Sequence, residues 1–296
     1  MSEKTVALVL GSGGARGMAH VGVIRALRAR GHEIRVIAGS SIGALVGAVY
    51  ALGKIDEFTE WISAIRRRDI LMLLDVSFRG EGLVKGDKVI DRLRGFFGEA
   101  YIEDLPVAFT AVAADIRKGR EVWIDSGPLF DAVRASISLP LFFTPYPHKG
   151  AKLFDGGLLN PVPVAPTMRH ATDLTVAVNL GGTPDRHRQP EMSESEPADD
   201  ADRNALHKKI TDFVETLKDG LPNLSPSESA FFDIMQSSFD AMQGTLARHQ
   251  LAAYRPDVEI RIPRDACTLL EFDRAAELIA LGQDAAERAL SEASAA

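Results

Sequence analysis

The stretch that decides the fold is TVALVLGSGGARGMAHVGVIRALRARGHEIRVIAGSSIGALVGAVYALG, residues 5–53. Its two apolar runs, TVALVL at 5–10 and EIRVIA at 33–38, are typical of strands that are buried on both faces. Between them, MAHVGVIRALRARG repeats apolar residues at helical spacing, and a second helix of small residues is expected at 42–53. This order predicts a strand–helix–strand crossover at the start of a parallel sheet.

Later segments continue the pattern of buried strands and intervening helices. The turn after the second strand holds two serines, and a nucleophile there comes earlier in the sheet than in a standard α/β-hydrolase. We therefore predict an α/β fold with a mainly parallel central sheet that does not follow the standard α/β-hydrolase order. Further strands are expected at 106–116, 120–125, 173–180 and 257–262, and further helices at 128–140 and 270–290.

We expect one domain over residues 1–296, although the length of the chain allows either one sizeable core or two small ones. The chain is 46% hydrophobic and 25% charged, as expected of a soluble globular protein. Residues 184–204 are polar and acidic, which predicts a flexible insertion, and a helical C-terminal part follows at 205–296. Amphipathic helices are expected at 206–217 and 232–246. The Phe/Met stripe of the second is typical of a core, although an acyl channel or a protomer interface would use the same pattern.

Charge and cysteine content exclude several classes of protein. The 34 Lys and Arg residues against 41 Asp and Glu residues leave a net charge of −7, which argues against nucleic-acid binding. Cys267 is the only cysteine, so the chain cannot form an intrachain disulfide or a cysteine-rich metal site. The N-terminal apolar run is too short for a signal peptide, and no segment reaches the roughly 20 apolar residues of a membrane span. A cytoplasmic location is therefore expected.

The two serines lie in Gly39-Ser40-Ser41-Ile42-Gly43, which fits the pattern G-x-S-x-G with Ser41 at its centre. The motif joins a strand to a helix, where glycines on both sides allow a sharp turn that exposes the central side chain. Gly39 and Gly43 would form this nucleophile elbow, and Ser41 would be the nucleophile. An ordinary strand–helix turn with Ser41 as the helix N-cap fits the same residues.

The glycine-rich loop GSGGARG, residues 11–17, follows the neighbouring strand at the same edge of the sheet. Its consecutive glycines, Gly13 and Gly14, leave backbone amides that can donate to the oxyanion of an acyl-transfer reaction. The same glycines allow a dinucleotide site as a rival, but Arg16 stands where G-x-G-x-x-G requires its third glycine, and only a looser spacing that ends at Gly17 fits. No carboxylate follows the second strand to hold a ribose, which also counts against the rival.

A serine nucleophile needs a base, and Asp155 is the best candidate. It follows a short apolar run in KLFDGGLLNPVPV, and Gly156 and Gly157 let the backbone turn sharply after it. An aspartate must be partly desolvated and held in position to accept a serine proton. Asp-Gly-Gly is also an ordinary turn. None of the downstream histidines has a glycine-rich or strand-end setting: His148, His170, His187, His207 and His249.

The three segments GSGGARG, GSSIG and DGG, in this order, resemble the patatin-like phospholipase family. The resemblance is closest to its compact bacterial members in the branch related to neuropathy target esterase, and it covers about residues 5–182. ASISLPLFFTP at 135–145 is similar to the family's block ahead of the aspartate, and Asn160-Pro161 also fits. Ser12 departs from the glycine that the family often has at that position.

The resemblance implies a three-layer αβα fold of the patatin type and a Ser41–Asp155 dyad that works without histidine. It also implies an oxyanion hole around the glycine-rich loop, where Arg16 matches the family's basic position. The candidate residues for this hole are Gly13, Gly14, Ala15 and Arg16.

The predicted function is a serine acyl hydrolase, either an esterase, a phospholipase or a lysophospholipase, that uses no cofactor and no metal. Its partner would be an acyl ester or phospholipid substrate. The basic and apolar stretch 66–78 could contact a membrane surface, although a core helix fits that stretch better. The sequence also leaves open whether the protein forms a homo-oligomer. The alternatives are a non-catalytic binding or regulatory module on the same fold and, as a weaker one, a dinucleotide-binding oxidoreductase.

Overall fold

The structure is a computed structural model that describes residues 3–65, 86–140, 142–184 and 226–295. Three of the segments discussed above lie outside these described residues: the stretch 66–78, the acidic insertion apart from Pro184, and the helix expected at 206–217.

The chain divides into two compact units. The first consists of Met1–Pro184 together with Met242–Ala296, and the second consists of Asp185–Ala241. Every described strand belongs to the first unit, as do both Ser41 and Asp155. One domain over residues 1–296 stays a prediction from the sequence.

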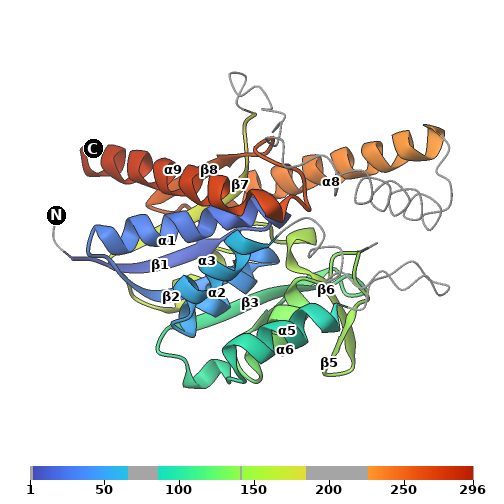
Figure 1. The fold of residues 1–296 in the computed structure, drawn as a ribbon, viewed down its shortest axis with the longest axis horizontal. Helices are drawn as coiled ribbons and strands as arrows, with labels where there is room; N and C mark the ends of the chain where they lie inside the picture. The colour runs from blue at the N-terminus through green and yellow to red at the C-terminus, as the bar shows by residue number, and fades with distance from the viewer. Residues whose placement is uncertain (1–2, 66–85, 141, 185–225, 296) are drawn as a thin grey trace, which may run out of the picture. The chain divides into compact units, whose positions relative to one another are not determined.

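The described strands of the first unit form one eight-stranded sheet in the order β5-β6-β3-β2-β1-β7-β8, with β4 paired to β3 (Figure 1). From β3 to β8 along this order, neighbouring strands are parallel, whereas β4 and β6 run antiparallel to β3. The prediction of a mainly parallel central sheet is therefore confirmed. The strands are β1 Thr5–Leu10, β2 Glu33–Ser40, β3 Ala108–Asp115, β4 Arg120–Ile124, β5 Tyr146–His148, β6 Ala151–Asp155, β7 Leu174–Gly182 and β8 Val258–Pro263.

Helices connect these strands, and short 3-10 turns lie at several of the junctions. The α-helices are α1 Ala19–Ala29, α2 Ile42–Ala51, α3 Ile55–Ala64, α5 Asp87–Phe97, α6 Leu129–Ser136, α8 Pro226–Ala253 and α9 Ala275–Ala295. The 3-10 turns are η1 Gly14–Met18, η2 Ile102–Asp104, η3 Gly156–Leu158, η4 Ala165–Arg169 and η5 Phe272–Arg274.

The two faces of the sheet pack into separate apolar clusters, because successive side chains of a strand point to opposite faces. Leu8 and Leu10 of β1 lie in the larger cluster with buried side chains of α1, α2 and α9. Val9 lies in the smaller cluster with Val164, which precedes η4, and Ala247 of α8. Helical segments therefore cover both faces of the sheet, which makes the three layers that the resemblance implies.

The first and last helices of the first unit, α1 and α9, lie side by side in contact (Figure 1). A Cβ atom added to Gly22 would lie 1.9 Å from the carbonyl oxygen of Ile279, and one added to Gly282 would lie 2.0 Å from that of Ala19. The two backbones thus touch at glycines, which alone have no Cβ to separate them.

Several elements differ from the sequence predictions. The β5–β6 hairpin was not predicted, because its strands are short and lack a long apolar run, and neither α3 nor α5 was predicted. The core expected along 232–246 is wrong at Met242, whose side chain is 59% exposed. At this end of α8, Ala247 and Leu251 face the smaller cluster instead.

Candidate active site

Ser41 lies in a sharp turn between β2 and α2. Its backbone has φ 56° and ψ −124°, a conformation that residues with a side chain rarely adopt. A Cβ atom at Gly39 would lie 2.5 Å from the backbone of Gly43, and one at Gly43 would lie 2.1 Å from the carbonyl oxygen of Leu10. Both glycines of the predicted elbow are therefore required by close backbone approach, which is the geometry that G-x-S-x-G turns provide.

Asp155 ends β6 and lies beside this turn. The Ser41 hydroxyl donates a hydrogen bond of 2.5 Å from Oγ to Oδ2 of Asp155. The other carboxyl oxygen, Oδ1, accepts the Gly157 amide at 2.8 Å, and the side chain is almost fully buried. The structure thus brings together two residues that stand 114 positions apart in the sequence.

Burial raises the pKa of Asp155 from 3.8 to about 7, because the carboxylate loses most of its hydration; the hydrogen bonds from Ser41 and from the Gly157 amide oppose the rise. A carboxyl group with a pKa near 7 is a stronger base than an exposed aspartate. It is still ionised in about half of the molecules or more at and above neutral pH.

The glycine-rich loop lies next to the Asp-Gly-Gly turn. A Cβ atom at Gly157 would lie 2.6 Å from the Ser12 hydroxyl oxygen, and the Ser12 amide donates to the Pro161 carbonyl at 2.8 Å. On its other side the turn packs on β3, since a Cβ atom at Gly156 would lie 2.1 Å from the Val112 carbonyl oxygen. All three sequence motifs therefore meet at one edge of the sheet.

The backbone amides of the glycine-rich loop differ in whether they have an acceptor. Those of Gly13 and Gly14 have no acceptor among the described residues, and the φ of +57° at Gly14 favours glycine. The Ala15 amide, by contrast, donates to the Leu269 carbonyl at 2.9 Å. Of the predicted donor set, the Ala15 amide therefore has a backbone acceptor, whereas the Gly13 and Gly14 amides have none among the described residues.

Arg16 and His20 hold the loop in place. The Arg16 guanidinium donates from Nε to the Gly13 carbonyl at 3.1 Å and from Nη1 to the Arg264 carbonyl at 2.9 Å. His20, which the sequence analysis did not consider, donates from Nε2 to the Gly11 carbonyl at 2.8 Å, since a carbonyl oxygen can only accept. Complete burial lowers the pKa of His20 to about 4, so its imidazole is neutral at physiological pH.

Asn160 and Pro161 extend the Asp-Gly-Gly turn toward β4. The Asn160 side chain is fully buried and donates from Nδ2 to Oε2 of Glu121 at 2.6 Å. The backbone amide of Asn160 donates to the Gly156 carbonyl at 2.8 Å, and this hydrogen bond closes the turn after Asp155. This pair supports the position of Asp155 and was recognised in the sequence only through the family resemblance.

Neither metal ligands nor a membrane-spanning helix is found in the part of the chain that the structure describes. No three His, Cys, Asp or Glu side chains there are grouped so that they could hold a metal ion. No described helix combines the length and the apolar character that crossing a bilayer requires.

Comparisons with known proteins give a consistent result. A family model described as patatin-like phospholipase matches residues 8–168. An uncharacterised NTE family protein of Mycobacterium tuberculosis is 39% identical over 342 residues, which cover 98% of this chain and 92% of that protein. Lysophospholipase NTE1 of Pyricularia oryzae is 34% identical over 190 residues, which cover 62% of this chain and 12% of the fungal protein. The structure of VipD from Legionella pneumophila aligns with 99% of this chain and 67% of its own at 14% identity, but its TM-score of 0.44 is too low to support an argument.

Proposed function

Because the chain belongs to the patatin-like phospholipase family, a family of lipolytic hydrolases, we propose that it is a serine acyl hydrolase that cleaves carboxylic ester bonds of lipids. The observation that carries this proposal is the hydrogen bond of 2.5 Å from the Ser41 hydroxyl, held in a strained elbow, to the buried carboxyl group of Asp155. A serine becomes a nucleophile when a positioned base accepts its proton, and this contact has the length that such a transfer needs.

In the first half of the reaction, the Asp155 carboxylate takes the proton from Ser41 Oγ as that oxygen attacks the ester carbonyl carbon. The Gly13 and Gly14 amides donate to the carbonyl oxygen as it becomes negatively charged. Losing one such donor typically slows an acyl transfer by about 10²–10³-fold. The tetrahedral intermediate then expels the alcohol, which leaves with the proton from Asp155, and an acyl-serine remains.

In the second half, Asp155 accepts a proton from water, and the resulting hydroxide attacks the acyl-serine carbonyl carbon. The same two amides stabilise this second oxyanion. Collapse of the intermediate returns the proton to Ser41 Oγ and releases the carboxylic acid. Asp155 ends as a carboxylate, so the cycle consumes one ester and one water.

The lipid substrate is proposed to be a phospholipid or lysophospholipid. Membership of a phospholipase family supports a lipid ester, and the fungal relative that matches 62% of the chain is named a lysophospholipase. The rate of fatty-acid release from diacyl phospholipid, compared with the rate from lysophospholipid, each in detergent micelles, would show which of the two is the better substrate. The membrane contact, the oligomeric state and the cytoplasmic location stay predictions from the sequence.

The experiment that tests the proposal is labelling with a fluorophosphonate, which reacts with activated serines, followed by mapping of the adduct. We expect the adduct on Ser41, and we expect Ser41→Ala and Asp155→Asn to abolish both labelling and ester hydrolysis. Asp115→Asn is the matched control, because Asp115 is a second buried carboxyl group and lies at the end of β3. No labelling of the folded wild-type protein, with no ester hydrolysis, would favour a binding module on the same fold.

A further inference from the structure

The end of α6 and the residues just after it contact both members of the proposed dyad through hydrogen bonds that could not be predicted from the sequence. The fully buried hydroxyl of Ser136 accepts the Ser41 amide at 2.9 Å and donates to the Val112 carbonyl at 2.6 Å. Two residues later, the Ser138 carbonyl accepts the Asp155 amide at 2.9 Å. One short segment thus fixes the backbone of the nucleophile and the backbone of the base.

The Ser136 hydroxyl has a specific task at the elbow. Ser41 follows the last residue of β2 and precedes the first residue of α2, so its amide needs an acceptor outside the regular hydrogen bonds of both elements. Val112 stands beside Ser40 in the register of β2 and β3, so the hydroxyl joins the elbow to the neighbouring strand. Without this hydroxyl, the partly buried Ser41 amide would lose its acceptor, and the strained conformation would lose a support.

Ser138 connects the base to a buried arginine. Its hydroxyl donates to the Arg134 carbonyl at 2.8 Å and accepts from Arg134 Nη1 at 2.8 Å. The backbone of Ser138, whose carbonyl holds the Asp155 amide, is therefore pinned by the arginine side chain. A shift of Arg134 would move this carbonyl, and the carboxyl group of Asp155 with it.

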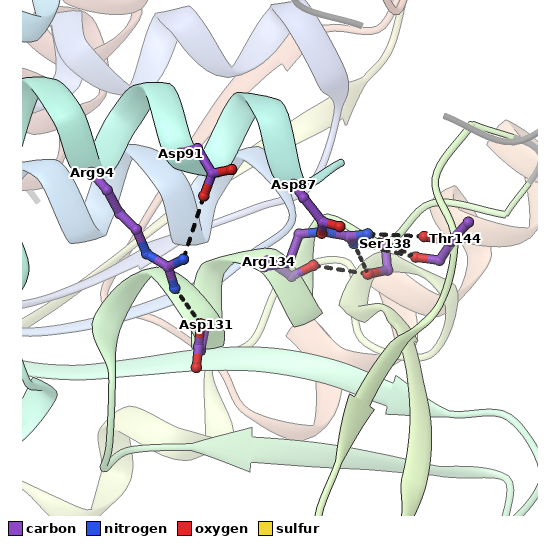
Figure 2. Close-up of polar contacts among 7 residues, drawn as sticks. All are labelled: Asp87, Asp91, Arg94, Asp131, Arg134, Ser138 and Thr144. Atoms are coloured by element: carbon purple, nitrogen blue, oxygen red, sulfur yellow. Dashed lines mark hydrogen bonds and ion pairs between the residues drawn. The ribbon is translucent and has the colours of Figure 1, made fainter. Parts of the chain in front are cut away.

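Arg134 is 3% exposed, and its guanidinium contacts Asp87, Ser138 and Thr144 (Figure 2). Nε donates to Oδ1 of Asp87 at 3.0 Å, and Nη2 donates to the Thr144 carbonyl at 3.2 Å and to its hydroxyl at 3.1 Å. The rings of Phe143 and Tyr146 lie with their centroids 6.0 Å and 5.9 Å from its central carbon. Several fixed donors in one plane are a property of arginine that lysine cannot reproduce.

We propose that Ser136 and Arg134 are positioning residues for ester hydrolysis, Ser136 acting on the nucleophile Ser41 and Arg134 acting through Ser138 on the base Asp155. This inference rests on the proposed function of the Ser41–Asp155 pair. Neither residue touches the reacting atoms, so both act on the rate of the chemical step and leave substrate binding unchanged.

The test compares Ser136→Ala, Ser138→Ala and Arg134→Lys with two matched controls on the full chain. Thr59→Val removes a buried hydroxyl that donates to the Ile55 carbonyl at 2.7 Å. Arg94→Lys removes a second arginine fork from the same region, where Arg94 contacts Asp91 and Asp131 (Figure 2). Each variant is assayed at least 15 °C below its own melting temperature, for fluorophosphonate labelling of Ser41 and for kcat and KM on a soluble ester.

In the three test variants, we expect the fluorophosphonate to label Ser41 about ten- to a hundredfold more slowly than in wild type, and kcat to fall by a similar factor. KM should change less than about twofold. A small misplacement of reacting groups lowers rates by this order. Both controls should label at the wild-type rate. If Arg134→Lys does not fold, Ser138→Ala breaks the same connection at its next step.

Three results would overturn the inference. If Ser41 is labelled at the wild-type rate in both Ser136→Ala and Ser138→Ala, the end of α6 does not position the dyad, while the proposed function stands. Controls that slow as much as the test variants would show a general loss of structure instead. If wild type itself does not label at Ser41, the proposed function fails, and the inference fails with it.

Discussion

Asp155 carries a carboxyl group that is 2% exposed and whose pKa burial raises from 3.8 to about 7. The base of the proposed mechanism must be ionised to accept the Ser41 proton, so the protonated form is inactive. In the proposed mechanism, desolvation of the Asp155 carboxyl group would therefore set the pH range of activity, a task for which many serine hydrolases use an imidazole.

The first prediction concerns activity against pH. We expect kcat/KM for a soluble ester to rise about tenfold per pH unit below pH 6 and to level off above pH 8, with a midpoint near the Asp155 pKa of about 7. Initial rates between pH 5 and pH 9 would measure this profile. A rate that is constant across this range would show that Asp155 is not the base.

The second prediction concerns stability against pH at the same residue. Because the pKa of Asp155 is higher in the folded chain than in the unfolded one, the folded state binds this proton more tightly. The free energy of unfolding is therefore highest below pH 4 as far as this group is concerned, and it falls as the pH rises toward 7. Asp155→Asn has no proton to lose and escapes this fall.

We accordingly expect Asp155→Asn to unfold at higher urea concentration than wild type at pH 8, with a gain of about 1–3 kcal/mol in the free energy of unfolding. At pH 5 the difference should shrink, since wild-type Asp155 is then mostly protonated. Asp115→Asn serves as the control for loss of a buried carboxyl group. An equal difference between wild type and Asp155→Asn at both pH values would contradict the raised pKa.

The junction of β2 and α2 is the element on which the elbow depends. A Cβ atom at Gly43 would lie 2.1 Å from the Leu10 carbonyl oxygen, so Gly43→Ala must push α2 away from β1. We expect this variant to lose about 3 kcal/mol or more of the free energy of unfolding, because the clash is with backbone that cannot yield locally.

Gly95 in α5 provides the matched control for this third prediction. A Cβ atom there would meet nothing within 4 Å, so Gly95→Ala should stabilise the chain by about 0.5–1 kcal/mol through helix propensity. Urea unfolding of the two variants beside wild type makes the measurement. Equal effects of the two substitutions would show that the close approach at Gly43 is not real.

The elements that could be predicted from the sequence are those with continuous patterns. β1, β2 and β7 were predicted within about two residues, since each is an apolar run that lies between two other strands. The β5–β6 hairpin was missed because three- and five-residue strands carry no period that distinguishes them from a loop. That hairpin places Asp155, so the base was located through its Asp-Gly-Gly turn and not through its strand.

The supports of the candidate site were beyond prediction for a different reason. The Ala15 amide and the Arg16 guanidinium contact the carbonyls of Leu269 and Arg264, and a backbone carbonyl has no sequence signature. The side chain of Ser136 was visible in the sequence, but its partner is the amide of a residue 95 positions away. Short motifs therefore located the candidate residues Ser41 and Asp155 and the glycine-rich loop, whereas the contacts that hold them could be found only from coordinates.

At the scale of the whole chain, the first unit joins its first and last described helices, α1 and α9, which pack against each other. α1 and α9 touch at Gly22 and Gly282, and β8 forms the edge of the sheet beside β7. Since α1 continues directly from the glycine-rich loop through η1, the packing of α9 bears on the loop that carries Gly13 and Gly14.

The fourth prediction tests this packing. A Cβ atom at Gly282 would lie 2.0 Å from the Ala19 carbonyl oxygen, so Gly282→Ala should separate the two helices and lower the free energy of unfolding by about 2–4 kcal/mol. Gly244→Ala in α8 is the control, because its nearest neighbour there is the end of the Arg248 side chain at 3.8 Å. Thermal unfolding of both variants gives the comparison, and an unchanged melting temperature for Gly282→Ala would contradict the observed contact.

The braces that Arg264 and Leu269 supply to the glycine loop also bear on when the proposed activity can arise during synthesis. Domains fold as the chain leaves the ribosome, N-terminal segments first. A nascent chain in which Ser41 and Asp155 have left the ribosome, but residues 264–269 have not, lacks two of the contacts that hold the glycine-rich loop. The unfinished polypeptide would thus be a poor catalyst of the proposed reaction, and a competent site would form only once residues 264–269 have left the ribosome.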